Sequence, residues 1–108
     1  MTPGDILKKC HSLSVAKTRE MGDEYAELVF FSKDLEKWDE VLSEVLGPAE
    51  KKRDARPSRE QQGLTRKLGG VRHGQTLFAK KCVQGTVVAM YWPWRDRTHI
   101  TLKLGLIA

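Results

Sequence analysis

Five side chains in the sequence belong to the types that bind metal ions or act as nucleophiles and bases: Cys10, His11, His73, Cys82 and His99. Zinc sites normally draw at least two of their ligands from residues a few positions apart. The one closely spaced pair is Cys10 and His11, and adjacent side chains on a helix point in different directions. We therefore expect no metal site and no bound cofactor, and we expect both cysteines to be reduced.

The segment Val71–Thr76 (VRHGQT) resembles the Arg-His-Gly motif of the histidine phosphatase and phosphoglycerate mutase family. The resemblance implies a phosphate site at Arg72 and a phosphorylated His73. In that family the motif follows a strand and works with a second His. No strand is predicted before Val71 here, and His99 is the one later His. We therefore expect a non-enzymatic protein.

A second set of residues has the types that bind phosphates and nucleobases. Eight Lys and Arg residues lie in the basic segment 51–73, and Arg59 and Arg66 share a face of the helix predicted there. Aromatic and guanidinium side chains alternate in Tyr91–Arg97, as they do where single-stranded nucleic acid stacks on protein. A nucleic-acid-binding module would use five cations of the basic segment: Arg56, Arg59, Arg66, Lys67 and Arg72.

The net charge of +5 hides three regions of different sign. Residues 1–50 hold six basic and eleven acidic side chains. Residues 51–73 hold eight basic and two acidic side chains, and residues 74–108 hold five basic and one acidic side chain. Glu36, Glu40 and Glu44 form an i, i+4 row in the acidic region. Two alternatives stay open: the basic segment pairs internally with this row, or it binds an acidic partner.

The stretch Phe31–Lys37 (FSKDLEK), followed by Leu46-Gly47, resembles the strand-to-helix region of the vicinal oxygen chelate (glyoxalase-like) superfamily. The predicted order of one strand, one helix and three strands fits that superfamily's βαβββ module. The resemblance implies a single-module member of this type. Metal ligands in the superfamily lie on the strands, and the first strand region here offers Glu24 and Glu27.

Three segments have helical patterns. From Ser32 to Gly47, large apolar residues recur every three or four positions, Ser32 can cap the first turn, and Gly47 and Pro48 end the helix. A short helix is expected to start at Thr2, where Thr, Pro and Asp occupy capping positions. A weaker helix is predicted over residues 59–68, because it has capping residues but few apolar ones.

Other segments have the patterns of strands. Alternating or continuous β-branched, aromatic and apolar residues predict strands at Tyr25–Phe31, Thr76–Val83, Thr86–Trp92 and Thr98–Ile107, with a shorter one over Ser12–Arg19. In the last strand, alternation puts the leucines on one face and His99, Thr101 and Lys103 on the other.

The last two predicted strands can be aligned through the turn between them. If Arg95 and Asp96 form a two-residue turn, the numbers of opposing residues sum to 191, which puts Tyr91 on the leucine face and Trp92 on the other. The same count about Gln84-Gly85 places Lys80 among core residues. We therefore expect the register of that hairpin to be bulged or shifted.

Together these patterns predict one α+β domain over residues 1–108. We expect a largely antiparallel sheet of four to five strands with two or three helices, the main helix packed on one face. Residues 49–63 are predicted to be a mobile basic linker within the domain. No apolar run is long enough to cross a membrane, and the N-terminal residues do not resemble a signal peptide, so we expect a cytoplasmic protein with no membrane partner.

The leading hypothesis for function is a small binding or adaptor module whose surface is an exposed sheet face and the Trp92–Arg97 turn. Its partner would be another protein, a small molecule or a second copy of the chain bound through the sheet face. The residues predicted to line this face are Met90, Trp92, Trp94, Arg97, His99, Thr101 and Lys103. Nucleic-acid binding through residues 51–73 and a glyoxalase-like protein are the alternatives.

Overall fold

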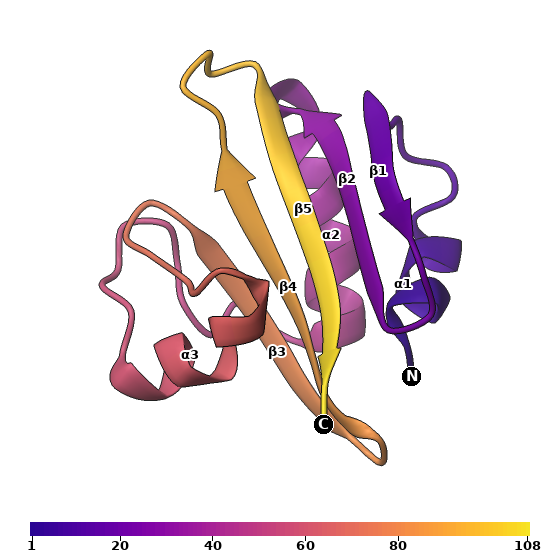
Figure 1. Cartoon of the computed structure of the whole chain (residues 1–108). Coiled ribbons are helices and arrows are strands. Elements are labelled where there is room, and N and C mark those ends of the chain that lie inside the picture. The colour runs from indigo at the N-terminus through magenta and orange to yellow at the C-terminus, as the bar shows by residue number, and fades with distance from the viewer.

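The computed structural model describes all residues 1–108, in which a five-stranded sheet carries three helices. The helices are α1 (Pro3–Lys9), α2 (Leu35–Leu46) and α3 (Arg59–Leu64), with 3-10 turns η1 (Ser32–Asp34) and η2 (Arg66–Leu68). The strands are β1 (Lys17–Met21), β2 (Tyr25–Phe31), β3 (Thr76–Cys82), β4 (Gly85–Pro93) and β5 (His99–Ile107). All neighbours are antiparallel, in the order β1-β2-β5-β4-β3 (Figure 1). The predicted α+β class is confirmed, and no helix has the length and apolarity needed to span a membrane.

One face of the sheet, called here the first face, is covered by α1 and α2. Fifteen buried residues form its core, and at the centre the ring of Phe30 in β2 stacks on Trp38 in α2 with centroids 4.8 Å apart. A polar contact also joins the two layers, because the hydroxyl of Tyr91 donates to the carboxylate of Asp39 at 2.8 Å. The main helix therefore packs where its apolar stripe predicted.

The opposite face, called the second face, is half covered by residues 58–72, which form a strap of α3, η2 and the turn that follows. Figure 1 shows the strap on the near side of the sheet and α2 behind it. Three apolar side chains of the strap, Leu64, Leu68 and Val71, pack with Leu77, Val88 and Met90 of β3 and β4. We expected this face to be exposed. Instead, the strap covers β3, β4 and the C-terminal end of β5, because its three apolar side chains turn toward the sheet.

The β4–β5 register differs from the predicted one by two residues. Trp92 lies opposite Thr101 and Pro93 opposite Ile100, because residues 94–98 form the connection where a two-residue turn was expected. Within that connection Arg97 has a positive φ of 61°. A shift by two leaves every side chain on its predicted face. Tyr91 therefore lies on the first face and Trp92 on the second, as expected.

The β3–β4 hairpin pairs two residues away from the count about Gln84-Gly85, so its register is shifted, as expected, and it contains no bulge. Lys80 lies opposite Val87, on the first face, and its side chain is exposed at the end of α2. There its ammonium group donates to the carbonyl of Val45 at 3.3 Å. A lysine is accommodated on the core face because it meets the negative end of the helix dipole.

Two other boundaries differ from the prediction. The strand expected over 12–19 is displaced to β1, since Leu13 still bonds to Cys10 in a turn and pairing with β2 begins at Ala16. The helix expected over 59–68 is interrupted at Thr65. The Thr65 hydroxyl donates to the carbonyl of Gln61 at 2.8 Å and accepts from the amide of Val71 at 2.8 Å, which closes the strap into a compact turn.

Candidate binding face

The part of the second face that the strap leaves open, at the end of β2 and the start of β5, carries three aromatic rings in a row, called here the aromatic ladder. It consists of Phe31 at the end of β2, His99 at the start of β5 and Trp94 in the connection before β5. Phe31 and His99 are cross-strand partners with ring centroids 5.3 Å apart. The centroids of His99 and Trp94 are 4.8 Å apart, and their planes differ by 33°. The rings therefore form a continuous π-surface at one end of the sheet.

Trp94 is held in place by two hydrogen bonds, although it lies outside a strand. Its indole Nε1 donates to the hydroxyl of Thr101 at 2.8 Å, and its amide donates to the carbonyl of His99 at 2.9 Å. Thr101 is 7% exposed and its strand neighbour Val29 is 1% exposed, although no helix covers this part of the face. Trp94 itself stays 37% exposed. The ladder is thus both pre-organised and accessible.

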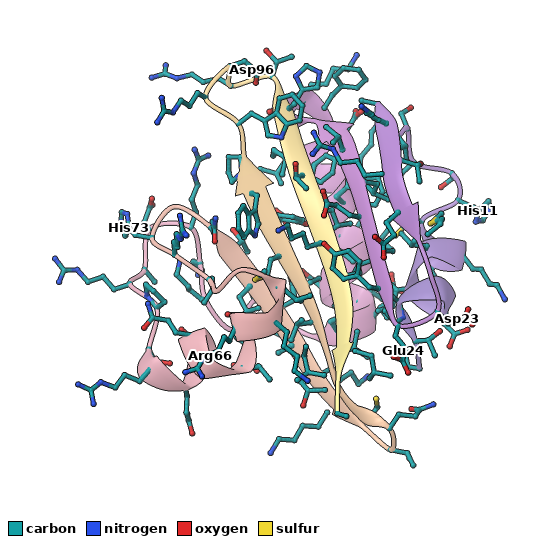
Figure 2. The ribbon with its side chains drawn as sticks, in the orientation of Figure 1. His11, Asp23, Glu24, Arg66, His73 and Asp96 are labelled. Atoms are coloured by element: carbon teal, nitrogen blue, oxygen red, sulfur yellow. The ribbon has the colours of Figure 1, made fainter.

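Asp96 fixes the turn that presents the ladder. One carboxylate oxygen accepts from the amides of Thr98 at 2.8 Å and His99 at 3.1 Å, and the other lies 2.6 Å from the His99 Nδ1. The hydrogen bond from the Thr98 amide, followed by the one from the His99 ring, lowers the pKa of Asp96. Figure 2 shows Asp96 at the tip of this connection. Both carboxylate oxygens of Asp96 are therefore engaged by groups of its own turn.

Cations lie over both ends of the ladder. The guanidinium of Arg19 is 5.6 Å from the Trp94 ring centroid, and the ammonium of Lys33 is 5.6 Å from that of Phe31. The nearby carboxylate of Glu27 is engaged, because it lies 3.7 Å from Arg19 and accepts from the hydroxyl of Tyr25 at 2.6 Å. Burial, followed by that hydrogen bond, raises the pKa of the Tyr25 phenol.

A second aromatic–cation pair lies where the strap meets the open half. The ammonium of Lys103 is 3.8 Å from the Trp92 ring centroid and donates to the carbonyl of Leu68 at 3.3 Å. Gly69 of the strap packs against the same ring, since a Cβ there would be 2.8 Å from an indole carbon. Trp92 and Lys103 therefore anchor the strap.

The structure divides the residues predicted to line the sheet face into three groups. Trp94, His99 and Thr101 come together in and beneath the ladder, and Arg97 is exposed in the adjacent connection. Trp92 and Lys103 form the strap contact. Met90 is 0% exposed because Leu68 and Val71 cover it, so a partner of the folded protein does not reach it.

The five cations predicted for nucleic-acid binding lie on the strap and its flanks, all exposed. None of Arg56, Arg59, Arg66, Lys67 and Arg72 forms an ion pair. Figure 2 shows Arg66 and His73 on this side of the molecule. The row Glu36, Glu40 and Glu44 is exposed on α2, behind the sheet, and forms no ion pair either. Of the two alternatives left open by the sequence, internal pairing of the two regions is not observed.

A buried lysine joins the two ends of the basic segment. Lys51 is 2% exposed, and its ammonium donates to the carbonyls of Lys52 at 3.0 Å and Gln75 at 2.5 Å. Burial lowers the pKa of this amine. The amide of Gly74 also donates to the carbonyl of Arg53 at 3.0 Å. The predicted linker 49–63 is therefore bonded to the loop before β3 as far as Arg53, and its residues 59–63 belong to α3, so mobility stays a prediction for residues 54–58.

Three members of the site were missed by the sequence analysis: Arg19, Phe31 and Lys33. Phe31 was predicted only as the last residue of a strand, with no face assigned to it, and its partner His99 is far away in the sequence. Arg19 reaches Trp94 through the irregular pairing of β1 with β2. Only the alternation of β2 about Phe30 could have indicated that Phe31 points to the second face.

Metal-binding residue types do not converge anywhere in the fold. No three His, Cys, Asp or Glu side chains are placed to hold an ion, and Glu27, one of the two candidates on the first strand, is bonded to Tyr25 and Arg19. Cys10 lies in the first-face core, where burial raises the pKa of its thiol to about 11. The glyoxalase-like alternative therefore finds no ligand group in this arrangement.

Comparisons of the chain with protein-family models, curated proteins and solved structures find no significant match.

Proposed function

We propose that the second face binds single-stranded nucleic acid, with bases stacked on the aromatic ladder and phosphates bound by the surrounding cations. The observation that carries the proposal is the row of Trp94, His99 and Phe31 with Arg19 and Lys33 at its ends. Aromatic faces accept any base, and neighbouring guanidinium and ammonium groups attract the backbone.

The distribution of charge supports a polyanion at this face. Two carboxylates near the ladder are engaged by other groups, Glu27 by Arg19 and Tyr25 and Asp96 by its own turn, whereas Glu20, opposite Glu27 in β1, forms no ion pair. The cations of the strap are unpaired, whereas the acidic row of α2 lies behind the sheet. Such separation would orient an approaching nucleic acid toward the second face.

The form of the site favours single strands over duplexes. Bases inside a duplex are stacked on one another, so their faces are not free for Trp94 or Phe31. The strap offers α3, a helix of six residues, as its longest element, which is short for insertion into a major groove.

Both cysteines are free, and a cytoplasmic location is part of the proposal.

A homodimer or a protein partner on the same face is the competing explanation. Face-to-face association of two copies would bring Arg19, Lys33 and the strap cations of both close together, which is unfavourable without an intervening anion. Sedimentation of the isolated protein tests this. A concentration-dependent dimer abolished by Trp94→Ala would contradict the nucleic-acid proposal.

Fluorescence anisotropy of labelled oligo(dT) and oligo(U), each about twelve nucleotides long, tests the proposal. We expect binding at low salt that weakens with added salt, and a loss of about tenfold or more in affinity for Trp94→Ala. Arg66→Gln should weaken binding and lower the salt dependence, whereas Lys9→Gln on α1 is the matched loss of one charge on the first-face side. Equal binding by Trp94→Ala and the wild type, or no binding at low salt, would overturn it.

A further inference from the structure

Strand β3 forms one edge of the sheet, and the chain pairs with its beginning only. The carbonyl of Leu77 accepts from the amides of Glu50 at 2.8 Å and Lys51 at 3.2 Å, and its amide donates to the carbonyl of Lys51 at 2.9 Å. These bonds form a single antiparallel bridge at the outer edge. After Leu77 no further segment of the chain pairs with this edge.

The next outward-facing main-chain groups of β3 have no partner. Because Leu77 bonds outward, it is a non-hydrogen-bonded partner of Met90, and Ala79 and Lys81 have the same position relative to β4 by alternation. No hydrogen bond within the chain uses the outward amide or carbonyl of either residue. The edge thus presents four unsatisfied groups in the arrangement that an extended peptide needs.

A pocket of about 500 Å³ lies beside this stretch of edge. Its apolar lining comes from Leu64 of α3 and from Leu77 and Ala79 of β3, and its polar rim holds the carboxylates of Glu50 and Glu60 as well as Lys80, Lys81 and Thr86. Side chains of an added strand would alternate between the two faces of the sheet. A residue opposite Ala79 would therefore enter the pocket on the second-face side.

We propose that β3 binds an extended acidic segment of another protein as a sixth strand. Lys80 and Lys81 determine the charge expected at the two partner positions opposite them. Pairing of two β3 edges would oppose the lysines of both copies, whereas acidic residues at those positions are favourable. The pocket takes an apolar residue next to this acidic pair. The partner sequence is then acidic, acidic, apolar for an antiparallel strand, and the reverse order for a parallel one.

Amide hydrogen exchange with two capped peptides tests this inference. The probes are Ser-Thr-Glu-Glu-Val-Thr for antiparallel addition and Ser-Val-Glu-Glu-Thr-Ser for parallel addition, with Ser-Thr-Lys-Lys-Val-Thr as the control. In the free protein, the amides of Ala79 and Lys81 should exchange fast, whereas that of Lys80, which faces β4, should be protected. One acidic probe should slow the exchange of Ala79 and Lys81 at least tenfold, and the lysine probe should not.

Two variants at one position separate main-chain pairing from charge. Lys81→Pro removes an outward amide and no bond to β4, so the sheet should persist while the protection of Ala79 is lost. Lys81→Gln keeps the amide and should weaken binding about two- to fivefold. If Lys81→Pro does not fold, the exchange measurement on the wild-type protein still tests the inference. Slow exchange of both amides in the free protein, no effect of either acidic probe, or undiminished binding by a folded Lys81→Pro variant would overturn the inference.

Discussion

The two faces of the sheet differ in how completely the chain covers them. On the first face, α1 and α2 bury a fifteen-residue core, whereas the strap buries a five-residue core over one half of the second face. The uncovered half is filled by ring-to-ring and ring-to-cation contacts among Arg19, Trp94, His99, Phe31 and Lys33. The difference indicates that stability depends mainly on the first face, and it underlies our proposal that the second face binds a ligand.

The largest effect that separates the faces is expected from Phe30→Ala in the first-face core. Phe30 is fully buried, stacks on Trp38 and meets Tyr91 edge-on with centroids 5.6 Å apart. Removing the ring should lower the free energy of unfolding by about 3–5 kcal/mol, as measured by urea denaturation. Phe31→Ala, one residue later and on the second face, is the matched control and should cost far less. Similar losses of unfolding free energy for the two variants would contradict the proposed difference between the two faces.

A smaller loss is expected when the strap loses its main apolar contact. Leu68 is 9% exposed and packs directly on Gly105, where a Cβ would lie 2.8 Å from a Leu68 methyl carbon. Leu68→Ala should destabilise the protein by about 2 kcal/mol, near the low end for such changes, because Leu68 belongs to the smaller core of five residues. Urea denaturation gives the value. A loss as large as that of Phe30→Ala would mean that the second-face core is as important as the first.

Lys80 tests how a lysine is tolerated on the first face. Its ammonium donates to the carbonyl of Val45 at the end of α2, so Lys80→Gln should cost about 0.3–1 kcal/mol at low salt, and less in concentrated salt. Lys81→Gln, whose side chain has no helix end to contact, is the control. Thermal denaturation compares them, and an unchanged or higher melting temperature for Lys80→Gln would contradict the helix-end contact.

The smallest effect is expected from acid titration of the Asp96 turn. Hydrogen bonds from the Thr98 amide and the His99 ring lower the folded-state pKa of Asp96 below its ordinary value of 3.8. The carboxylate therefore contributes stability above about pH 4, and that contribution is lost as the pH falls through the lowered folded-state pKa. The difference in melting temperature between wild type and Asp96→Asn should shrink as the pH falls from about 5 to 2. A difference that grows with acid would contradict this assignment.

Much of the fold follows from local patterns, and the site does not. The helix α2 and the faces of β4 and β5 were predicted because the periodicity of apolar residues is local to each element. The β4–β5 register was wrong by two residues, since the length of its turn depends on contacts such as that of Trp94 with Thr101; the β3–β4 register is shifted, as expected, although the sequence did not predict by how much. Trp94, His99 and Thr101 were predicted as site residues, but their connection to Arg19 and Phe31 arises from strand pairing that the sequence does not specify.

The most direct test of the contrast follows the side-chain indole signals of the three tryptophans by nuclear magnetic resonance during titration with oligo(dT). Trp94 lies in the ladder, whereas Trp38 is 1% exposed in the first-face core. Binding at the second face should shift the Trp94 indole signal most, shift that of Trp92 less, and leave that of Trp38 unchanged. An unmoved Trp94 signal, or a shift of Trp38 as large as that of Trp94, would contradict the assignment of binding to the second face.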